Sequence, residues 1–499
     1  MKLDAAARAT KLERLRDGGA PRVLELCSGC GGMSLGLAAA GFELLAHVEF
    51  DATAAASYAL NFRPPSEDHR AAWAAPRDMV LSDPASLARE IGLGDDICQR
   101  FDVLAAGLPC QAFARIGRSK LRSVSGDEEA FKNDPRAQLY RRFLQYAEAV
   151  QPVAIVIENV PDILNHGGHN VPEEICGTLE EMGYVARYTL LNAAYYGVPQ
   201  MRERLFLVAI DRSLGVEPSF PQPTHSAKLP SGYAAARMVA LRHVPAEGSH
   251  FAAIPAPASG LPGAITVKAA LSDLPRVREH FRDPVVMRRR KVMDHLPYAS
   301  FSDLTDYAKL MRNWTGFQKS HASTDGHVVR LTPRDFPIFR RMDQGGDYPH
   351  ACEVAAQIFK EKLAAQKPRP VRGTPAYDAL KASTVPPYDP GKFPNKWWKL
   401  DPGMPSRTLT AHMGKDTYSH IHWDGSQKRT VTVREAARLQ SFPDGFRFAG
   451  AMNAAFRQIG NAVPPLLAQA VGASLRKDLV RLPHAVQQDG ARSLESDAA

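Results

Sequence analysis

The sequence has few cysteines and no long hydrophobic run. Six cysteines stand among 499 residues, too few for the disulfide frameworks that hold small secreted domains together. The longest apolar stretches, such as Val153–Ile157, fall far short of the ~18–20 residues that a membrane-spanning helix needs. No apolar segment follows the charged start of the chain, so we expect no signal peptide and free thiols in a cytoplasmic setting.

A complete metal site, an internal repeat and a low-complexity tract are also lacking. Cys27-x-x-Cys30 has half of the spacing of a zinc site, but no second pair of Cys or His follows at similar spacing, so we expect no metal. The 36 glycines show no three-residue period, which excludes a collagen-like chain. Hydrophobic residues make up 44% of the chain, enough to bury a core, which excludes overall disorder.

What the sequence does have is length and a surplus of positive charge. The 62 lysines and arginines exceed the 53 aspartates and glutamates, which gives a net charge of +9. At roughly 150 residues per domain, the length predicts two to three domains. The charge favours a polyanion as partner, although many soluble proteins are mildly basic.

Short apolar runs alternate with helical segments in the first part of the chain. Helices are predicted at Met33–Ala40 and Ala137–Val150. Apolar strands that alternate with helices indicate an α/β fold with a parallel sheet covered on both faces. The predicted strands are Val23–Leu26, Leu44–Glu49, Asp102–Ala106, Val153–Ile157 and Leu205–Ile210.

Changes in composition divide the chain into five segments. The first is charged and rich in alanine and predicts a frayed helix. The third is rich in proline and irregular, and the last is polar and expected to be mobile. Regular elements belong to the second and fourth. The predicted segments are 1–20, 21–213, 214–428, 429–480 and 481–499.

A glycine-rich turn, Glu25–Gly32, joins a predicted strand to a predicted helix. Glycines let backbone amides approach a ligand closely. A ribose needs an acceptor about 20 residues later, at the end of the next strand, where Glu49 stands with Phe50 beside it. A tight structural turn is about as good an interpretation of the glycines alone. Strand, helix and Glu49 in register favour a nucleoside-containing cofactor, and the lack of a phosphate-binding lysine argues against a nucleoside triphosphate.

Cys110 follows the predicted strand Asp102–Ala106 on a turn shaped by Gly107 and Pro109. In open α/β sheets the carboxyl ends of the strands bind ligands, and a thiol there is a candidate nucleophile. A small buried apolar side chain, the usual role of a free cysteine, is an equally good interpretation. The segment Ala114–Pro135 is long for a connection and rich in Gly, Ser and cations, which indicates a functional flap.

Acidic and basic side chains stand at neighbouring strand ends. Glu158 follows the run Val153–Ile157. It is either an acid whose pKa is raised by its surroundings or a solvated residue at the end of a strand. Arg202 and Arg204 enter the next strand on one side and need anionic or carbonyl partners there. Structural carboxylates, including Glu158, could supply them.

In their order along the chain these motifs resemble those of the DNA (cytosine-5)-methyltransferases. A single motif of this kind is weak evidence, but the ordered set is specific. The likeness covers about residues 21–211 and 400–475. The motifs are Glu25–Gly32, Glu49, Pro109-Cys110-Gln111, Glu158-Asn159-Val160, Gln200-x-Arg202-x-Arg204, Pro405–His412, Arg429–Asp444 and Gln458–Pro464.

The resemblance implies a Rossmann-like methyltransferase fold and S-adenosyl-L-methionine as cofactor. Glu49 would accept the ribose hydroxyls, Phe50 would lie on the adenine, and Asp83 would receive the adenine amino group. Many members have an aromatic residue where this chain has Cys27, so one face of the adenine should be less well stacked. The implied cofactor-binding residues are Cys27, Ser28, Gly29, Cys30, Gly31, Gly32, Glu49, Phe50, Asp83, Pro109, Asn461 and Ala462.

The resemblance also implies the chemistry. Cytosine C5 is a poor nucleophile, and Cys110 would add to C6 so that C5 gains electron density. Glu158 would hydrogen-bond or protonate N3, Arg204 would contact the carbonyl, and Arg202 would organise the site. Because the ring cannot be reached within a duplex, the cytosine must be flipped out, and the flap Ala114–Pro135 could close over it. This chemistry needs no metal.

Double-stranded DNA is the partner that the resemblance implies. Residues 214–428 would form a smaller, mostly irregular target-recognition domain that contacts phosphates and base edges. The C-terminal motifs would return to the catalytic domain. We expect a cytoplasmic, nucleoid-associated monomer, either solitary or acting on the same sequence as a restriction endonuclease. Arg288–Lys291 is interpreted as a solvated charge cluster, and Trp397 and Trp398 as packing residues.

Two other functions remain open. An RNA cytosine-5 methyltransferase could use the same scaffold, although the long region between Arg204 and Arg429 favours reading of a duplex. The second alternative is a catalytically inactive DNA-binding protein that binds S-adenosylmethionine. Such a binder would not need Cys110, Glu158 and the two strand-end arginines.

Overall fold

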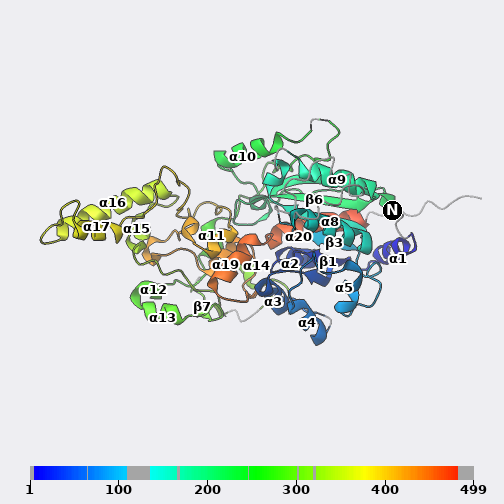
Figure 1. The fold of residues 1–499 in the computed structure, drawn as a ribbon, viewed down its shortest axis with the longest axis horizontal. Coiled ribbons are helices and arrows are strands. Elements are labelled where there is room, and N and C mark those ends of the chain that lie inside the picture. Colours follow the sequence, from blue (N-terminus) through cyan, green and yellow to red (C-terminus); the bar gives the residue numbers. More distant parts are fainter. Residues whose placement is uncertain are drawn as a thin grey trace, which may run out of the picture.

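The computed structural model describes residues 5–64, 66–109, 135–165, 169–245, 247–299, 303–318 and 322–480. An α/β body and a second lobe of loops and short helices lie at opposite ends of the long axis of the molecule (Figure 1). The predicted tail 481–499 and nearly all of the predicted flap lie outside the described residues. Where the domains begin and end stays a prediction.

A six-stranded sheet in the order β2-β1-β3-β4-β6-β5 forms the centre of the α/β body. All five predicted strands are present, but the sheet is not parallel throughout, because β6 runs antiparallel to both of its neighbours. The segment 193–202, which joins β5 to β6, is too short for the crossover that a parallel pair requires. The strands are β1 (Arg22–Leu26), β2 (Glu43–Val48), β3 (Val103–Ala106), β4 (Ala154–Asn159), β5 (Tyr184–Asn192) and β6 (Glu203–Asp211).

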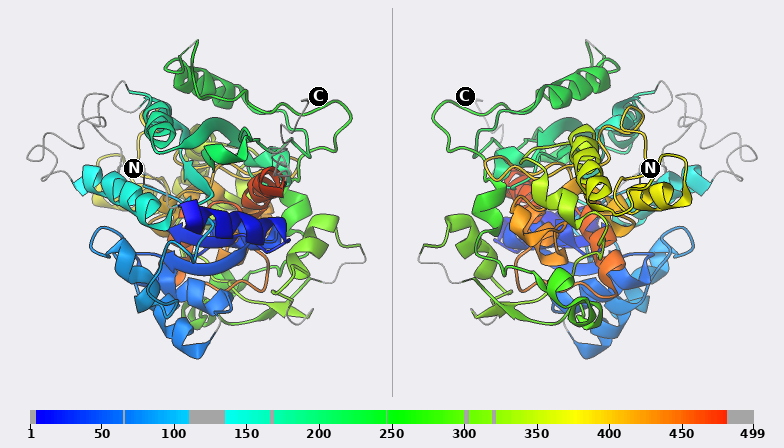
Figure 2. Two further views of the ribbon diagram at one scale, coloured as in Figure 1. Left: turned by 90° about the vertical axis from the view of Figure 1, so that its right-hand side faces the viewer. Right: turned by 90° about the vertical axis from the view of Figure 1, so that its left-hand side faces the viewer.

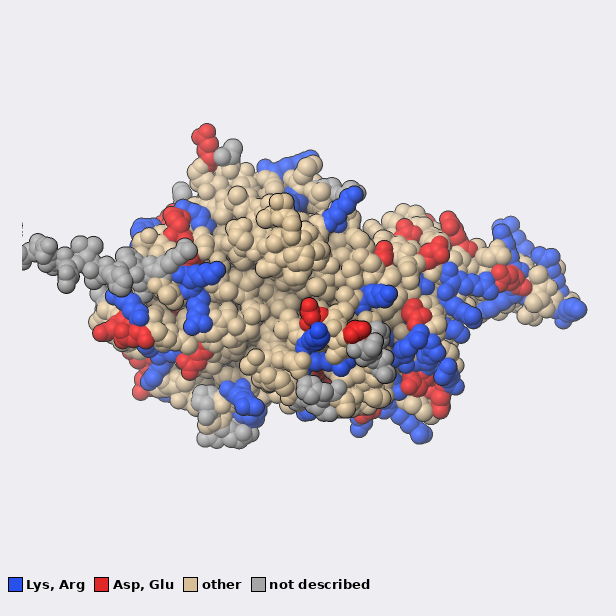
Figure 3. Space-filling model, turned by 180° about the vertical axis from the view of Figure 1, so that it is seen from behind, with Lys and Arg blue, Asp and Glu red and all other residues tan. Residues whose placement is uncertain are grey.

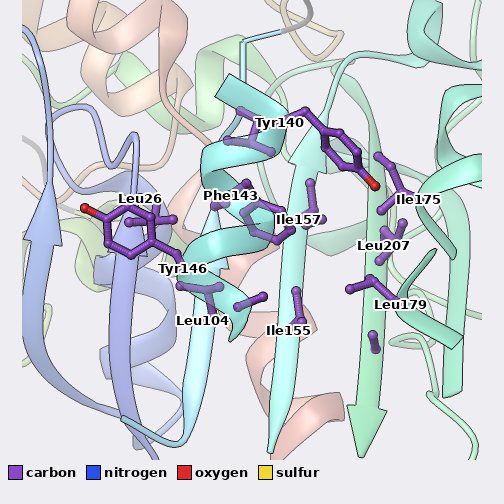
Figure 4. Packing of buried hydrophobic residues seen from close by; sticks show 14 of the residues in the cluster. Leu26, Leu104, Tyr140, Phe143, Tyr146, Ile155, Ile157, Ile175, Leu179 and Leu207 are labelled. Carbon is purple, nitrogen blue, oxygen red and sulfur yellow. The ribbon is translucent and has the colours of Figure 1, made fainter. Parts of the chain in front are cut away.

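Helices cover both faces of this sheet, because alternate residues of each strand point to opposite sides. Leu104 and Ile157 pack under α5, α8 and α9, and Figure 4 shows Phe143 and Tyr146 of α8 over this side of the sheet. Val103 packs toward α1, α2 and α20 on the other face. The helices of the body are α1 (Ala5–Arg16), α2 (Gly32–Ala39), α3 (Ala52–Asn61), α4 (Glu67–Ala74), α5 (Pro84–Glu90), α8 (Pro135–Val150), α9 (Val171–Glu181), α18 (Val433–Leu439), α19 (Met452–Asn461) and α20 (Pro465–Val480).

The N-terminal helix α1 is docked on the body, which corrects the expectation of a frayed helix. Leu12 and Leu15 are buried. The Lys11 ammonium, also buried, donates hydrogen bonds to the carbonyls of Val150 and Gln151 at the end of α8, at 2.8 and 2.9 Å. Burial lowers the pKa of Lys11 to about 8. The Lys11 ammonium, bound to two carbonyls, thus ties α1 to the end of α8.

The C-terminal helix α20 returns to the N-terminal elements (Figure 1, Figure 2). It packs against α2 so closely that a Cβ atom at Gly36 would lie 2.4 Å from the Cβ of Ala468 and 2.4 Å from the carbonyl oxygen of Pro465. Only a residue without a side chain fits this crossing. The contact brings residues near the end of the chain beside the helix that follows the glycine-rich turn.

Residues 214–428 are mostly loops joined by short helices, and the longest described helix there is α16 with 18 residues. The first part of this segment packs on the α/β body, where Ala240 of α10 joins the body's core. The second lobe is formed by later elements, among them α12, α13, α15, α16 and α17. On the face drawn in Figure 3, lysine and arginine side chains gather over this lobe. The elements are α10 (Ser231–Leu241), α11 (Val267–Leu271), α12 (Glu279–Arg282), α13 (Pro284–Arg289), β7 (Leu296–Pro297), α14 (Asp306–Arg312), β8 (Ser323–Thr324), α15 (Phe336–Arg341), α16 (Tyr348–Ala365) and α17 (Pro375–Ala382). The short 3-10 turns of the chain are η2 (Pro161–Asn165), η3 (Ala193–Tyr196), η4 (Arg212–Leu214), η5 (Ala411–Gly414), η6 (Tyr418–His420) and η7 (Gly425–Gln427).

The lobe has a small core of its own, in which Trp397 is buried. The indole stacks on Tyr418 with ring centroids 4.6 Å apart, so its predicted packing role is confirmed. Trp398 is half-buried beneath the guanidinium of Arg407, 4.8 Å from the ring centroid. In the predicted basic cluster, Arg290 pairs with a glutamate of α12 at 3.3 Å, and the other three cations are exposed. Across the described ranges, no helix combines the length and the apolar character needed to cross a membrane.

The tight crossing of α2 and α20 can be tested by adding one methyl group. Gly36→Ala places a methyl against Ala468 and the backbone of α20, and we expect it to lower the free energy of unfolding by about 1–3 kcal/mol. Gly177→Ala in α9 is the matched control, because a Cβ there meets nothing within 4 Å. We expect that change to be neutral or stabilising by up to about 1 kcal/mol. Urea unfolding followed by circular dichroism measures both, and equal losses would contradict the crossing.

Candidate active site

A cavity of about 840 Å³ lies at the carboxyl ends of β1 to β4, where α19 and the start of β6 close it. The other predicted cofactor residues, Gly31, Gly32 and Asp83, are not among its lining residues, and Cys110 lies outside the described residues. The predicted residues that line it are Cys27, Ser28, Gly29, Cys30, Glu49, Phe50, Pro109, Glu158, Arg202, Arg204, Asn461 and Ala462. The structure thus brings both predicted groups, the cofactor residues and the strand-end acid and cations, to one cavity.

The glycine-rich turn owes its shape to left-handed backbone and close packing. Gly29 has φ 57° and Gly31 has φ 93°, values that favour glycine. A Cβ atom at Gly31 would lie 2.3 Å from the ring of Phe62, and one at Gly32 would lie 2.4 Å from the carbonyl oxygen of Val463. Gly31 and Gly32 therefore seat the start of α2, while the earlier residues of the turn face the cavity.

Glu49 is held rigidly at the end of β2 by two backbone amides. Its carboxylate oxygens accept hydrogen bonds from the N–H groups of Gly29 and Asp51, each at 2.7 Å. Burial raises the pKa of Glu49, and these hydrogen bonds act in the opposite direction. Phe50, next in the chain, is 74% exposed at the cavity rim. A fixed carboxylate beside an uncovered aromatic ring can hold a ribose and cover a base.

The two cysteines of the turn have separate surroundings. Cys27 has φ 52°, a strained value for a residue with a side chain, and its thiol lies 3.6 Å from the sulfur of Met79. Burial raises the pKa of the Cys27 thiol to about 12. Cys30 is buried, with its sulfur 3.9 Å from the carbonyl oxygen of Gln458. Both thiols are thus neutral packing groups of the cavity wall.

Asp83 caps a helix and does not face the cavity. Its carboxylate accepts a hydrogen bond from the N–H of Ser86 at 3.1 Å, at the start of α5. Asp78, five residues earlier, lines the cavity, and its Oδ1 accepts the N–H of Val80 at 2.8 Å. Both aspartates stand in one irregular stretch before α5, so spacing alone does not distinguish them. Glu25, Arg77 and Arg457 are further lining residues for which the sequence analysis predicted no role.

Glu158 and Arg204 form a buried ion pair at the strand-end edge, with Nε and Oε1 2.9 Å apart. Burial raises the pKa of Glu158, and the neighbouring Arg204 and Arg202 oppose that rise. Burial also lowers the pKa of Arg204. The interpretation of Glu158 as a solvated strand-terminal residue is therefore wrong. A buried carboxyl whose proton is held more tightly than usual, beside a guanidinium donor, can act as an acid.

Arg202 anchors the C-terminal segments to the sheet. Its guanidinium is 1% exposed and donates hydrogen bonds to the carbonyls of Leu409, Gly460 and Ala462 at 2.6, 3.1 and 3.1 Å. Carbonyl partners thus bind both Nη groups, whereas the buried Nε has no partner among the described residues. Burial lowers the pKa of Arg202 well below the ordinary value. The same bonds place Asn461 on the cavity wall.

The chain leading to the predicted nucleophile is held by the strand beside it. The side-chain amide of Asn159, at the end of β4, donates a hydrogen bond to the carbonyl of Leu108 at 3.0 Å. Pro109 is exposed and lines the cavity. Because Pro109 is the last described residue before the gap, the position of Cys110 stays a prediction.

Glu25 is a buried acid beneath the cavity. The Ser34 hydroxyl, which lies 2.8 Å from the Tyr58 hydroxyl oxygen, donates a hydrogen bond to the Glu25 carboxylate. Burial raises the pKa of Glu25 to about 8. Between about 4.5, its ordinary value, and about 8 the folded protein holds a proton that the unfolded chain has released. The free energy of unfolding therefore falls as the pH rises through this window.

Glu25→Gln removes the titrating group and should flatten that pH dependence. We expect the loss of unfolding free energy between about pH 5 and about pH 8 to be smaller by on the order of 1–4 kcal/mol in the variant. Urea unfolding at both pH values, without cofactor, measures it. Glu43→Gln, at an exposed glutamate of β2, is the control and should keep the wild-type slope. A slope unchanged by Glu25→Gln would show that another group sets it.

Comparisons with known proteins agree on one family. The family model described as C-5 cytosine-specific DNA methylase matches residues 21–477. The chain is 38% identical to a proposed type II methyltransferase, M.OihORF3336P, from Oceanobacillus iheyensis, over 92% of this chain and 96% of that protein. It is 30% identical to the type II methyltransferase M.AgeI from Thalassovita gelatinovora, over 91% of this chain and 99% of that one.

A solved structure supports the same fold. The crystal structure of a proposed DNA modification methyltransferase encoded within an E. coli prophage is similar to this chain, with a TM-score of 0.55 and 22% sequence identity. The match covers 92% of this chain and 99% of that one. The arrangement of the sheet and its helices is therefore that of a known Rossmann-like methyltransferase fold.

Proposed function

The chain belongs to the family of C-5 cytosine-specific DNA methylases, and from that premise we propose that it transfers a methyl group from S-adenosyl-L-methionine to C5 of a flipped cytosine in one short duplex sequence. The observation that carries this proposal is the shared cavity, with Glu49 at one end and the Glu158–Arg204 pair at the other. A methyl donor and a base acceptor bound at these two ends would meet within a single pocket.

The cavity fits the proposed cofactor. Glu49 has a fixed carboxylate for the ribose hydroxyls, and the exposed ring of Phe50 can cover adenine. Asp78 stands on the cavity wall and is better placed than Asp83 to accept the adenine amino group. Cys27 offers a thiol where an aromatic ring would stack. When bound, S-adenosyl-L-methionine supplies an electrophilic methyl group.

The residues at the other end would activate the base. In our proposal the Cys110 thiolate adds to cytosine C6, and Glu158 gives a proton to N3, which removes the negative charge that the addition creates. Arg204 donates a hydrogen bond to the cytosine carbonyl and keeps Glu158 in place. C5 then takes the methyl group as the bond between that methyl and the donor sulfur breaks, which leaves neutral S-adenosyl-L-homocysteine and a positive charge on the base. Solvent water accepts the C5 proton, the electron pair of that C–H bond re-forms the C5–C6 double bond, and the Cys110 thiolate leaves C6. Glu158 recovers the N3 proton, and 5-methylcytosine remains.

The partner that this chemistry implies is double-stranded DNA. Residues 214–428 would read the sequence as a target-recognition domain, with the exposed cations of the second lobe on phosphates. The named relatives are type II methyltransferases, so we propose that the enzyme protects a sequence against a cognate restriction endonuclease. We place it in the cytoplasm, at the nucleoid.

Expression in a host without cytosine methylation should give 5-methylcytosine in one short sequence context. Bisulfite sequencing of the host DNA measures the change and identifies the target. Unchanged DNA despite soluble protein would sink the proposal. Methylation confined to RNA would instead favour the RNA methyltransferase alternative.

Duplex DNA that carries 5-fluorocytosine in the target should trap the protein covalently, because the fluorine cannot leave as a proton does. Cys110→Ser should abolish trapping, whereas Cys352→Ser, at a cysteine of α16 in the other lobe, should not. If the Cys110→Ser variant were still trapped, as seen on a denaturing gel, the nucleophile would lie elsewhere.

Glu158→Gln should slow methyl transfer by about 10²–10⁴-fold, the usual contribution of a general acid. The affinity of this variant for the cofactor should stay unchanged, because Glu158 stands at the base end of the cavity.

A further inference from the structure

An ion pair joins two walls of the cofactor cavity. Nη2 of Arg457, on α19, lies 2.7 Å from Oδ2 of Asp51, which precedes α3. The two residues stand 406 positions apart in the chain, and both line the cavity. Their side chains are 49% and 36% exposed, so the pair lies at the open side of the cavity and is weak enough to open and close.

Asp51 connects this pair to the ribose acceptor. The backbone N–H of Asp51 donates to one oxygen of Glu49 at 2.7 Å. The other carboxylate oxygen of Asp51 accepts the N–H groups of Thr53 and Ala54 at 2.9 and 3.1 Å and so caps α3. A displacement of Asp51 would therefore also displace Glu49 and the exposed Phe50 between them.

The other arginines that line the cavity have partners that do not join its two walls. Arg202 donates to three backbone carbonyls, and Arg204 is paired with Glu158. The Arg77 guanidinium donates to the carbonyl of Ala72. Arg457 differs from them because it spans the cavity from the C-terminal wall to the β2 side, one helical turn before Asn461.

We propose that the Arg457–Asp51 pair is a latch that slows release of the bound nucleoside, both the S-adenosyl donor and the demethylated product. Arg457 is a positioning residue: by holding Asp51 it fixes Glu49 and closes the side of the cavity beside Phe50. The proposal rests on the cofactor use proposed above. An opening of this pair would precede exit of the nucleoside.

Arg457→Gln in the full-length protein tests the latch. We expect the product analogue S-adenosyl-L-homocysteine to dissociate about two- to five-fold faster, the factor that an exposed ion pair contributes. The KM for S-adenosyl-L-methionine should rise by a similar factor, with kcat unchanged at saturating cofactor. Raising the salt from about 0.05 M to about 0.5 M should speed release from the wild type and leave the variant unchanged.

Matched variants separate the latch from a structural role. Asp51→Asn keeps a helix-capping side chain and should reproduce the effect of Arg457→Gln. The double variant should release S-adenosyl-L-homocysteine no faster than either single variant. Arg457→Lys should retain the salt response. Arg476→Gln is the control, because Arg476 is exposed on α20 and donates to the carbonyl of Ala40 outside the cavity.

The outcomes distinguish this inference from the proposed function. A wild type that binds no S-adenosyl-L-methionine would overturn the proposed cofactor use and the latch together. A wild type that binds it, with release from Arg457→Gln at the wild-type rate, would overturn the latch alone. A fall in kcat together with a fall in melting temperature, not reversed by Arg457→Lys, would show that Arg457 holds the fold instead.

Discussion

The molecule depends on one buried guanidinium, that of Arg202. A cation removed from water must find strong acceptors inside the protein, and Arg202 finds them in the carbonyls of Leu409, Gly460 and Ala462. These carbonyls come from segments more than 200 positions away in sequence. The hydrogen bonds from Arg202 to these carbonyls complete the cavity, because the chain around Ala462 forms the wall that faces the strand ends. The strand-end edge of the sheet and the C-terminal motifs thus form one cavity wall.

Buried arginines also join the two lobes, and these come from the C-terminal motif that carries α18. Arg434 pairs with Asp325, and Arg438 pairs with Asp273 at 3.0 Å and with Asp444 at 2.5 Å. Both Asp325 and Asp273 belong to residues 214–428. Because an unpaired buried charge is costly, this region cannot leave α18 without loss of stability. This C-terminal motif therefore joins the two lobes.

The sequence predicted the strands that local apolar runs determine. It did not predict the features that depend on contacts between distant segments. Apolar runs revealed the parallel strands and so placed Glu49 and Glu158 at one edge. The strand β5 escaped notice because partly exposed residues such as Arg187 interrupt its apolar run, and the direction of β6 follows from the short connection before it. A buried lysine such as Lys11 gives no signal in one sequence. Asp78 could not be separated from its neighbours, because only the path of the chain brings it to the cavity.

The packing of α20 on α2 has a consequence for the synthesis of the chain. A ribosome delivers the glycine-rich turn and α2 early, but the helix that covers α2 is among the last elements to emerge. Until Pro465–Val480 leaves the exit tunnel, the Gly36 face of α2 stays open and Arg202 lacks its carbonyl partners. Domains ordinarily fold as units during synthesis, yet this one cannot close before Pro465–Val480 has been made. A chain cut before Pro465 would therefore leave the Gly36 face of α2 uncovered.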